Sequence, residues 1–337
     1  MKKLIVALAA LALMSGSAYA AEWNFYGTAR VTTVWQQDDV IDGEDGDLQY
    51  VEGLYQDACI GAEVKVSDEL SAGFEYDADG AGGTAGIEVL YGEWNFGAGS
   101  LLVGQAETPI NIYYSNQFAA GDAEDLALWG FGDFYVDESP EIMLTFGGFK
   151  IAILSPATDE YEATYGDVQV VVPAIHLGYT LGFDMGEVTL AGGYATFEAG
   201  VNDENIDSYG IGAGASLNFG PVNVFGTFMY GQNVAVLGVV TSSNYQGVGT
   251  LADDCDSIGF TAGAKFTITE MFAVEAGYGY IKEEIGDGED EGQSYYIQAP
   301  ITVAPGVTIT PEVGMIDDMD SGQNERLYFG AGWEIAF

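Results

Sequence analysis

The sequence has few basic residues and no long hydrophobic run. Its 337 residues include only 8 Lys and Arg against 52 Asp and Glu, which gives a formal net charge of −44. A surface of this charge repels a phosphate backbone, so the composition excludes nucleic acid as a partner. The same imbalance favours cations as partners or cargo. Hydrophobic residues still make up 48 % of the chain, which excludes an intrinsically disordered protein.

Cysteine and histidine are also scarce. Cys59 and Cys255 are the two cysteines and His176 is the single histidine, so the chain lacks the ligands of a soft metal site. We therefore expect no tightly bound metal or other cofactor. The two thiols could form one disulfide bond if their Cα atoms come within about 7 Å of each other. The sequence leaves this alternative open.

The N-terminus is typical of a secretory signal peptide. Two lysines precede an apolar run over residues 4–14, and residues 18–20 read Ala-Tyr-Ala, a small-x-small cleavage site. We expect residues 1–20 to be removed and residues 21–337 to form one domain. Removal takes both lysines with it and leaves 6 basic residues against 52 acidic ones, a net charge of −46.

The mature chain has no run of 18 consecutive apolar residues, which excludes a membrane-spanning helix. Apolar and polar residues alternate instead, most clearly over residues 258–268, 307–315 and 327–337. Alternation with a period of two is the signal of a β-strand with one apolar face. The 48 glycines and the 13 % aromatic content also favour strands over helices. The fold class is therefore all-β.

The connections alternate between short and long. Tight turns are indicated at residues 67–69, 97–99, 147–148, 184–186, 220–221, 270–271 and 304–306. Longer acidic connections are expected at residues 36–48, 78–84, 108–139, 156–166, 199–207, 233–256, 284–292 and 317–324. Fifteen connections join sixteen antiparallel strands, with both termini at the tight-turn end, which is typical of bacterial outer-membrane barrels. Sixteen strands enclose an aqueous channel.

Three segments of the chain resemble general diffusion porins of Gram-negative outer membranes. They are the aromatic-rich start of the mature chain at residues 22–27, the segment LVGQAETP at residues 102–109, and the C-terminal WEIAF at residues 333–337. The resemblance implies a homotrimer of independent pores in the cell outer membrane, in contact with lipid and lipopolysaccharide. It also implies that the third loop is folded into the lumen of each pore. Terminal Phe337 resembles the signal read by the barrel-assembly machinery.

The longest connection, residues 108–139, lies where the third loop of the family belongs. The acidic residues expected at this constriction are Glu107, Asp122, Glu124, Asp125, Asp133, Asp137 and Glu138. The family typically places a cluster of arginines opposite such acids, and this chain has too few basic residues to do so. The constriction is therefore expected to be mostly negative.

Charged residues within the strands are expected to face the lumen, because a charge on the lipid face destabilises a barrel. By alternation the lumen wall carries Arg30, Glu63, Lys65, Glu75, Lys150, Lys265, Glu275, Glu312, Arg326 and Glu334. Each could serve a selectivity lining, or each could be an ordinary water-facing residue. The sequence leaves both interpretations open.

Two acidic runs, residues 42–47 and 286–291, do not match the spacing of a calcium-binding EF-hand loop. We interpret both as solvated external loops that bind divalent cations loosely near lipopolysaccharide. A saline habitat could also account for part of the acidity.

The leading interpretation is a passive outer-membrane channel for ions and small hydrophilic solutes that prefers cations. A channel specific for one solute remains an alternative, and so does a structural or adhesive surface barrel. An enzyme ranks last, because a barrel phospholipase needs a serine beside its histidine base and none is recognisably placed beside His176. We expect His176 to be a hydrogen-bonded residue of the wall.

Overall fold

The computed structural model describes residues 21–38, 46–54, 58–79, 84–118, 128, 130–202, 204–241, 246–319 and 325–337. The signal peptide expected at residues 1–20 lies outside this part of the chain. So do three of the acids expected at the constriction, Asp122, Glu124 and Asp125.

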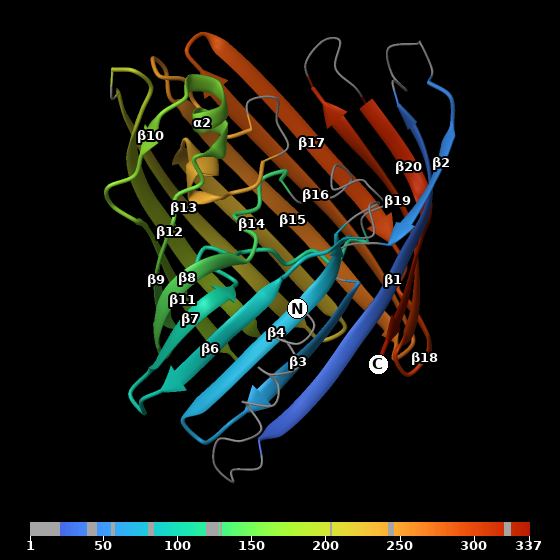
Figure 1. Cartoon of the computed structure of the whole chain (residues 1–337). Helices are drawn as coiled ribbons and strands as arrows, with labels where there is room; N and C mark the ends of the chain where they lie inside the picture. The colour runs from blue at the N-terminus through green and yellow to red at the C-terminus, as the bar shows by residue number, and fades with distance from the viewer. Residues whose placement is uncertain are drawn as a thin grey trace.

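The described chain is almost entirely β-structure, arranged as a closed antiparallel barrel (Figure 1). The strand segments are β1 (Glu22–Asp38), β2 (Gln49–Leu54), β3 (Cys59–Lys65), β4 (Leu70–Asp79), β5 (Thr84–Ala85), β6 (Val89–Asn95), β7 (Ser100–Ala106), β8 (Ser139–Phe146), β9 (Phe149–Leu154), β10 (Val168–Gln169), β11 (Ala174–Phe183), β12 (Gly186–Ala199), β13 (Glu204–Phe219), β14 (Val222–Gln232), β15 (Cys255–Thr269), β16 (Phe272–Ile285), β17 (Gly288–Gln298), β18 (Ile301–Ala304), β19 (Val307–Asp318) and β20 (Glu325–Ala336). Two short helices, α2 (Asp159–Tyr165) and η3 (Val234–Leu237), lie in the connections. In the described residues, no helix is both long and apolar enough to span a membrane.

The twenty strand segments make sixteen barrel strands. Segments β2 and β3 both pair with β1, and β5 and β6 both pair with β4. Likewise β10 and β11 both pair with β12, and β17 and β18 both pair with β16. Each of these pairs is one interrupted strand, and the sheet closes where β1 pairs with β20. The predicted sixteen-stranded all-β barrel is confirmed.

All seven tight turns lie where the sequence predicts them, whereas two predicted long connections are shorter than expected. The connection expected at residues 199–207 has only four residues, because β12 continues to Ala199 and β13 begins at Glu204. The acidic stretch at residues 284–292 is not a long external loop, because β16 and β17 continue through it and only Gly286 and Asp287 separate them. Gly286 has a φ of 58°, the left-handed conformation that such a hairpin turn requires and that glycine adopts most easily. Lys282 forms an ion pair with Glu284 of its own strand and another with Glu289 across this hairpin.

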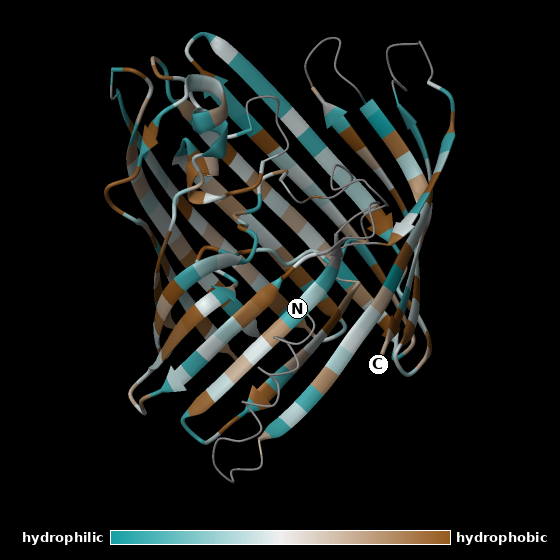
Figure 2. Cartoon of the chain, viewed as in Figure 1, coloured by the Kyte–Doolittle hydropathy of each residue, from teal (hydrophilic) through white to brown (hydrophobic). Residues whose placement is uncertain are grey.

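Alternation divides the wall into an apolar face and a polar face, and Figure 2 shows the resulting bands of brown and teal along the strands. On β15, Ile258 and Phe260 are exposed while Ser257 and Thr261 are buried. This is the inverse of a soluble protein, and it is the arrangement of transmembrane barrels, in which the outward apolar face suits a lipid environment.

Several glycines of the polar face lie beneath aromatic rings. A Cβ added at Gly277 would collide with the ring of Tyr296, and one added at Gly314 would collide with the ring of Tyr328. The rings therefore lie directly against the wall. This close approach accounts for part of the high glycine content.

Candidate functional site: the polar face of the barrel

The connection between β7 and β8 hydrogen-bonds to strands on the opposite side of the barrel. Figure 1 shows its described parts running from the β7–β8 side towards β16 and β19. The backbone N–H of Asn116 donates to Glu275 Oε1 of β16 at 2.9 Å. The backbone N–H of Phe118 donates to Glu312 Oε2 of β19 at 2.8 Å. Two wall carboxylates thus hold this segment by its main chain.

Further hydrogen bonds surround the Glu275 carboxylate. The side-chain amide of Asn116 donates to Oε2 at 2.9 Å. The hydroxyl of Tyr296 donates to Oε1 at 2.7 Å, and the amide of Gln298 donates to the same oxygen at 3.1 Å. Gln298 also donates to the Asn116 carbonyl at 2.6 Å. Four donors therefore satisfy one buried carboxylate.

The Glu312 carboxylate is held in a similar way. The hydroxyl of Tyr328 donates to Oε1 at 2.7 Å, and the amide of Gln117 donates to that hydroxyl at 2.6 Å. The Gln117 carbonyl oxygen in turn accepts the backbone N–H of Leu128 at 2.6 Å. This chain of hydrogen bonds ties two separate parts of the segment to one wall residue.

These contacts correct the expectation for two wall residues. Glu275 is 0 % exposed and Glu312 is 6 % exposed, so neither presents a free carboxylate to water. A buried carboxylate is stable only when hydrogen bonds replace its hydration, and the segment supplies them. Sequence reasoning missed Tyr296, Tyr328 and Gln298. The sequence pattern that could have indicated them is their place at the polar-facing positions of β17 and β20, alternating with apolar residues.

Arg30 lies at the end of the same segment. Its Nε lies 3.1 Å from Glu334 Oε2, and its guanidinium carbon lies 4.9 Å from the centre of the Phe118 ring. The cation thus contacts both a wall carboxylate of β20 and an aromatic ring of the segment, which is a favourable cation–π arrangement.

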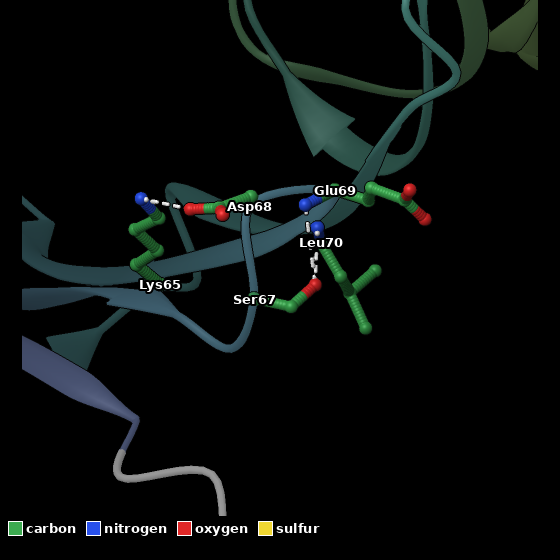
Figure 3. Close-up of polar contacts among 5 residues, drawn as sticks. All are labelled: Lys65, Ser67, Asp68, Glu69 and Leu70. Carbon is green, nitrogen blue, oxygen red and sulfur yellow. Dashed lines mark hydrogen bonds and ion pairs between the residues drawn. The ribbon is translucent and has the colours of Figure 1, made fainter.

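Three other basic residues are also ion-paired. Arg326 Nε lies 2.6 Å from Asp38 Oδ1, and Lys282 pairs with glutamates of its hairpin. Lys65 Nζ lies 2.8 Å from Asp68 Oδ1, within the turn between β3 and β4 (Figure 3). In that turn the hydroxyl of Ser67 accepts the backbone N–H groups of Glu69 and of Leu70, the first residue of β4. Lys65 was expected on the lumen wall, but it lies at the tight-turn end of the barrel, where its ammonium group pairs with Asp68.

Lys150 on β9 and Lys265 on β15 differ from these four. Neither forms an ion pair within the described part of the chain. Lys150 is exposed, and Lys265 is half-buried. Glu63 is exposed and Glu75 half-buried on β3 and β4. These four residues keep their charges available to water.

The acidic residues of the β7–β8 connection have different environments. Asp133 is fully buried, its Oδ1 accepts the backbone N–H of Gly130 at 2.7 Å, and burial raises its pKa to about 7. The expectation that Asp133 lines the constriction as a free charge is therefore wrong. Asp137 is exposed and Glu138 half-buried. Burial and the charge of Glu138 raise the pKa of Glu107, and Lys150 opposes this shift.

A second connection, between β14 and β15, packs onto the first. Val136 and Val239 form an isolated antiparallel bridge. Residues of η3 and the ring of Tyr161 from α2 join Phe134 and Val136 in one buried apolar cluster. The polar face thus carries an apolar layer over part of β11–β14, which alternation alone did not indicate.

This layer covers His176. The ring is 0 % exposed, and within the described residues neither nitrogen has a hydrogen-bond partner. It lies with Leu237 of η3 over Gly193, which has no side chain to displace them. The prediction that His176 is a hydrogen-bonded residue of the wall is wrong, because the apolar layer separates its ring from polar groups.

The disulfide bond that the sequence left open is not formed. Cys59 and Cys255 are both free thiols. Cys59 on β3 is paired with Thr28 and Asp77 of neighbouring strands, whereas Cys255 begins β15 beside β16. The connection before β15 does pack against the wall through the apolar residues of η3, and Cys255 stays on its own strand. Among the described residues no three His, Cys, Asp or Glu side chains are grouped for a metal ion.

Comparisons with known proteins agree with this architecture. The sequence profile of the family described as Gram-negative porin matches residues 7–321. No curated protein sequence matches the chain.

Several solved structures share the fold. The outer membrane channel DcaP of Acinetobacter baumannii has a TM-score of 0.73 at 16 % identity, with 95 % of this chain and 99 % of that chain covered. An anion-selective porin from Comamonas acidovorans has a TM-score of 0.67 at 15 % identity, with 94 % and 100 % covered. The trimer form of OmpT, an outer membrane protein of Vibrio cholerae, has a TM-score of 0.57 at 14 % identity, with 94 % and 100 % covered.

At these sequence identities the solved structures show the fold alone. The match of the family profile to residues 7–321 shows the family. Barrel closure, strand number and lipid-facing apolar residues are those of a channel of the Gram-negative outer membrane rather than of an enzyme. The chain belongs to the Gram-negative porin family.

Proposed function

We propose that this protein forms a water-filled channel through which ions and small hydrophilic solutes diffuse passively, with a preference for cations. One observation carries the sign of the preference. Of the 6 basic residues beyond residue 20, Arg30, Lys65, Lys282 and Arg326 are already paired with acids. The 52 acidic residues therefore leave a negative balance wherever the two remaining lysines lie.

The β7–β8 connection is proposed as the constriction, folded into the lumen. Its hydrogen bonds to Glu275 and Glu312, both on the polar face, support this placement. With Asp133 buried, the charges assigned to the passage are Glu107, Asp137 and Glu138, together with wall acids such as Glu63 and Glu75. Asp122, Glu124 and Asp125 remain proposed constriction residues on the basis of the sequence.

The solved relatives do not decide the sign of selectivity, because one of them is an anion-selective porin. The charges of this chain support a preference for cations. Carboxylates in a water-filled space bounded by low-dielectric walls raise the local cation concentration. Screening acts over about 8 Å at physiological ionic strength, so the preference should be incomplete.

Planar-bilayer recording of the purified protein tests this proposal. A stepwise conductance in KCl is expected from an open channel. In a salt gradient the reversal potential should have the sign of potassium preference. A channel that prefers chloride would overturn the charge argument, and absence of any conductance would overturn the channel itself.

A homotrimer is proposed as the assembled state. Strands β6, β7, β8 and β9 are 6 to 8 residues long, shorter than the about 9–11 residues that span a bilayer. Exposed apolar residues such as Leu90, Val103 and Ile142 line a groove of about 790 Å³ on this short sector. A partner copy, rather than lipid, would cover it. Native mass spectrometry in detergent should show three chains, and a monomer would contradict the proposal.

The ends of the chain carry two further proposals. Residues 1–20 are proposed as a signal peptide, which mass analysis of the mature protein would test. Phe337 is proposed as the assembly signal. Its backbone exchanges two hydrogen bonds of 2.9 Å with Gly27 of β1, and its ring is exposed. Loosely bound divalent cations at the acidic external loops, next to lipopolysaccharide, complete the proposed partners.

A further inference from the structure

A polar recess lies between the start of the β7–β8 connection and the wall strands β9, β11 and β12. Its volume is about 190 Å³. Since one water molecule occupies about 30 Å³ of the liquid, the recess has room for about six water molecules or one small organic solute. The side chains that matter here are those of Glu107, Asn111, Tyr114, Lys150, Glu187 and Thr189.

The backbone of the connection is packed tightly against the wall at this point. A Cβ added at Gly178 would collide with the Pro109 carbonyl. Tyr114 donates to the hydroxyl of Thr189 at 3.3 Å, and that hydroxyl lies 3.0 Å from the hydroxyl of Thr180. The hydroxyl groups on one side of the recess are thus fixed before any solute enters, which lowers the cost of binding.

The charges of the recess are unusual for this chain. Lys150 is exposed and forms no ion pair in the described part of the protein, although Glu107 and Glu187 line the same recess. Four of the other basic residues are bonded to carboxylates. The recess therefore gathers one ammonium group and two carboxylates that form no direct ion pair among the described residues.

We propose that this recess binds small zwitterions that carry one ammonium and one carboxylate group, the class of short amino acids. The solute carboxylate lies against the Lys150 ammonium, and the solute ammonium lies between Glu107 and Glu187. This inference rests on the proposed channel function and adds a solute class to it.

Charge complementarity selects this class over its neighbours. A simple cation in the recess meets the repulsion of Lys150. A simple anion meets the repulsion of Glu107 and Glu187. A neutral polyol finds hydroxyl partners but leaves all three protein charges without a counter-charge.

The test uses β-alanine as the zwitterion, with propionate, propylammonium and propionamide as probes of similar size. Potassium current through the purified channel is recorded in a planar bilayer at neutral pH while each probe is added. We expect β-alanine to reduce the current in a saturable manner and the three other probes to leave it unchanged at equal concentration.

The variant Lys150→Met should raise the half-blocking concentration of β-alanine about tenfold or more. Lys265→Met is the matched control, because it removes the other unpaired lysine from a different strand. It should leave the block unchanged. Equal block by propylammonium and β-alanine, or equal effects of the two lysine variants, would overturn the proposal.

Failure of the site and failure of the channel give different results. A normal potassium conductance without any β-alanine effect overturns the recess as a binding site and leaves the channel intact. If no conductance is found, binding of β-alanine to the folded protein in detergent is measured by calorimetry. Heat of binding that is lost in Lys150→Met supports the site on its own, and no heat in the unmodified protein overturns it.

Discussion

Two sectors of the polar face use their acidic residues in opposite ways. On β16 and β19, Glu275 and Glu312 are buried beneath the β7–β8 connection and accept hydrogen bonds from it. On β9 and β12, Lys150 and Glu187 line an open recess under the start of the same connection. One sector anchors the connection, and the other leaves its charges available to solutes. The comparison teaches that formal charge in the sequence is not the charge presented to water.

The double variant Glu275→Gln/Glu312→Gln should break the anchoring sector. Hydrogen bonds to charged groups contribute about 1.5–3 kcal/mol each, so the loss of two carboxylates should lower stability by several kcal/mol. Release of the connection should also raise single-channel conductance and current noise. Thermal unfolding in detergent and bilayer recording measure the two effects.

Glu63→Gln/Glu93→Gln is the matched control for this variant. It removes the same charge from β3 and β6, at side chains that the described connection does not contact by hydrogen bonds. If both double variants change conductance equally, charge rather than anchoring determines the effect.

Asp133→Asn should give a pH-dependent gain in stability. The pKa of Asp133 is raised from 3.8 to about 7 by burial, so the folded state holds a proton that the unfolded chain releases. Stability of the unmodified protein therefore falls as the pH rises through this window and is highest below it. With 1.36 kcal/mol per pH unit, the penalty above pH 7 is at most about 4 kcal/mol.

The asparagine amide imitates the protonated acid, so the variant should match the unmodified protein at pH 4 and exceed it at pH 8. Unfolding temperatures across this range are the measurement. A constant difference at every pH would show that ionisation of Asp133 is not the cause.

Phe118→Leu should remove the buried ring beneath Arg30, and the cation–π contact should account for about 1 kcal/mol of the resulting loss of stability. The same substitution in an Arg30→Met background separates this contact from the loss of packing area. If the cost is the same in both backgrounds, the guanidinium does not stabilise the ring.

Lys65→Met should have the smallest effect. The Lys65–Asp68 pair lies on the turn in Figure 3, with 55 % and 95 % of the two side chains exposed, and exposed pairs contribute little to stability. No change in unfolding temperature is expected. A clear drop would show that this rim turn is more important to the barrel than the anchored sector suggests.

Much of the candidate site could not be predicted from alternation. Alternation places Glu275, Glu312 and Lys150 on the same polar face of the wall. The two glutamates are nevertheless buried, and Lys150 is exposed. The position of a residue along an alternating strand predicts which face of the wall its side chain occupies. It does not predict which other segment covers that face. The covering segment is more than a hundred residues away in sequence from both glutamates, so no local pattern connects them.

The β16–β17 hairpin shows the same limit in another way. Six acidic or glycine residues in a row indicate a solvated loop. In the structure Lys282 of β16 pairs with Glu289 and Glu291 of β17, and both strands continue through this stretch. Cross-strand pairing decided the length of this connection.

The sequence by itself determined the barrel, its sixteen strands and its tight turns, because side-chain period and turn residues act over a few neighbouring residues. Only the tertiary structure decided which acids are buried, that His176 lies under an apolar layer, and that Lys150 forms no ion pair with the residues the structure describes. Those outcomes depend on where two long connections pack. Segments far apart in the chain pack together because their shapes and hydrogen-bonding groups fit across the barrel. Local alternation of apolar and polar residues does not predict that fit.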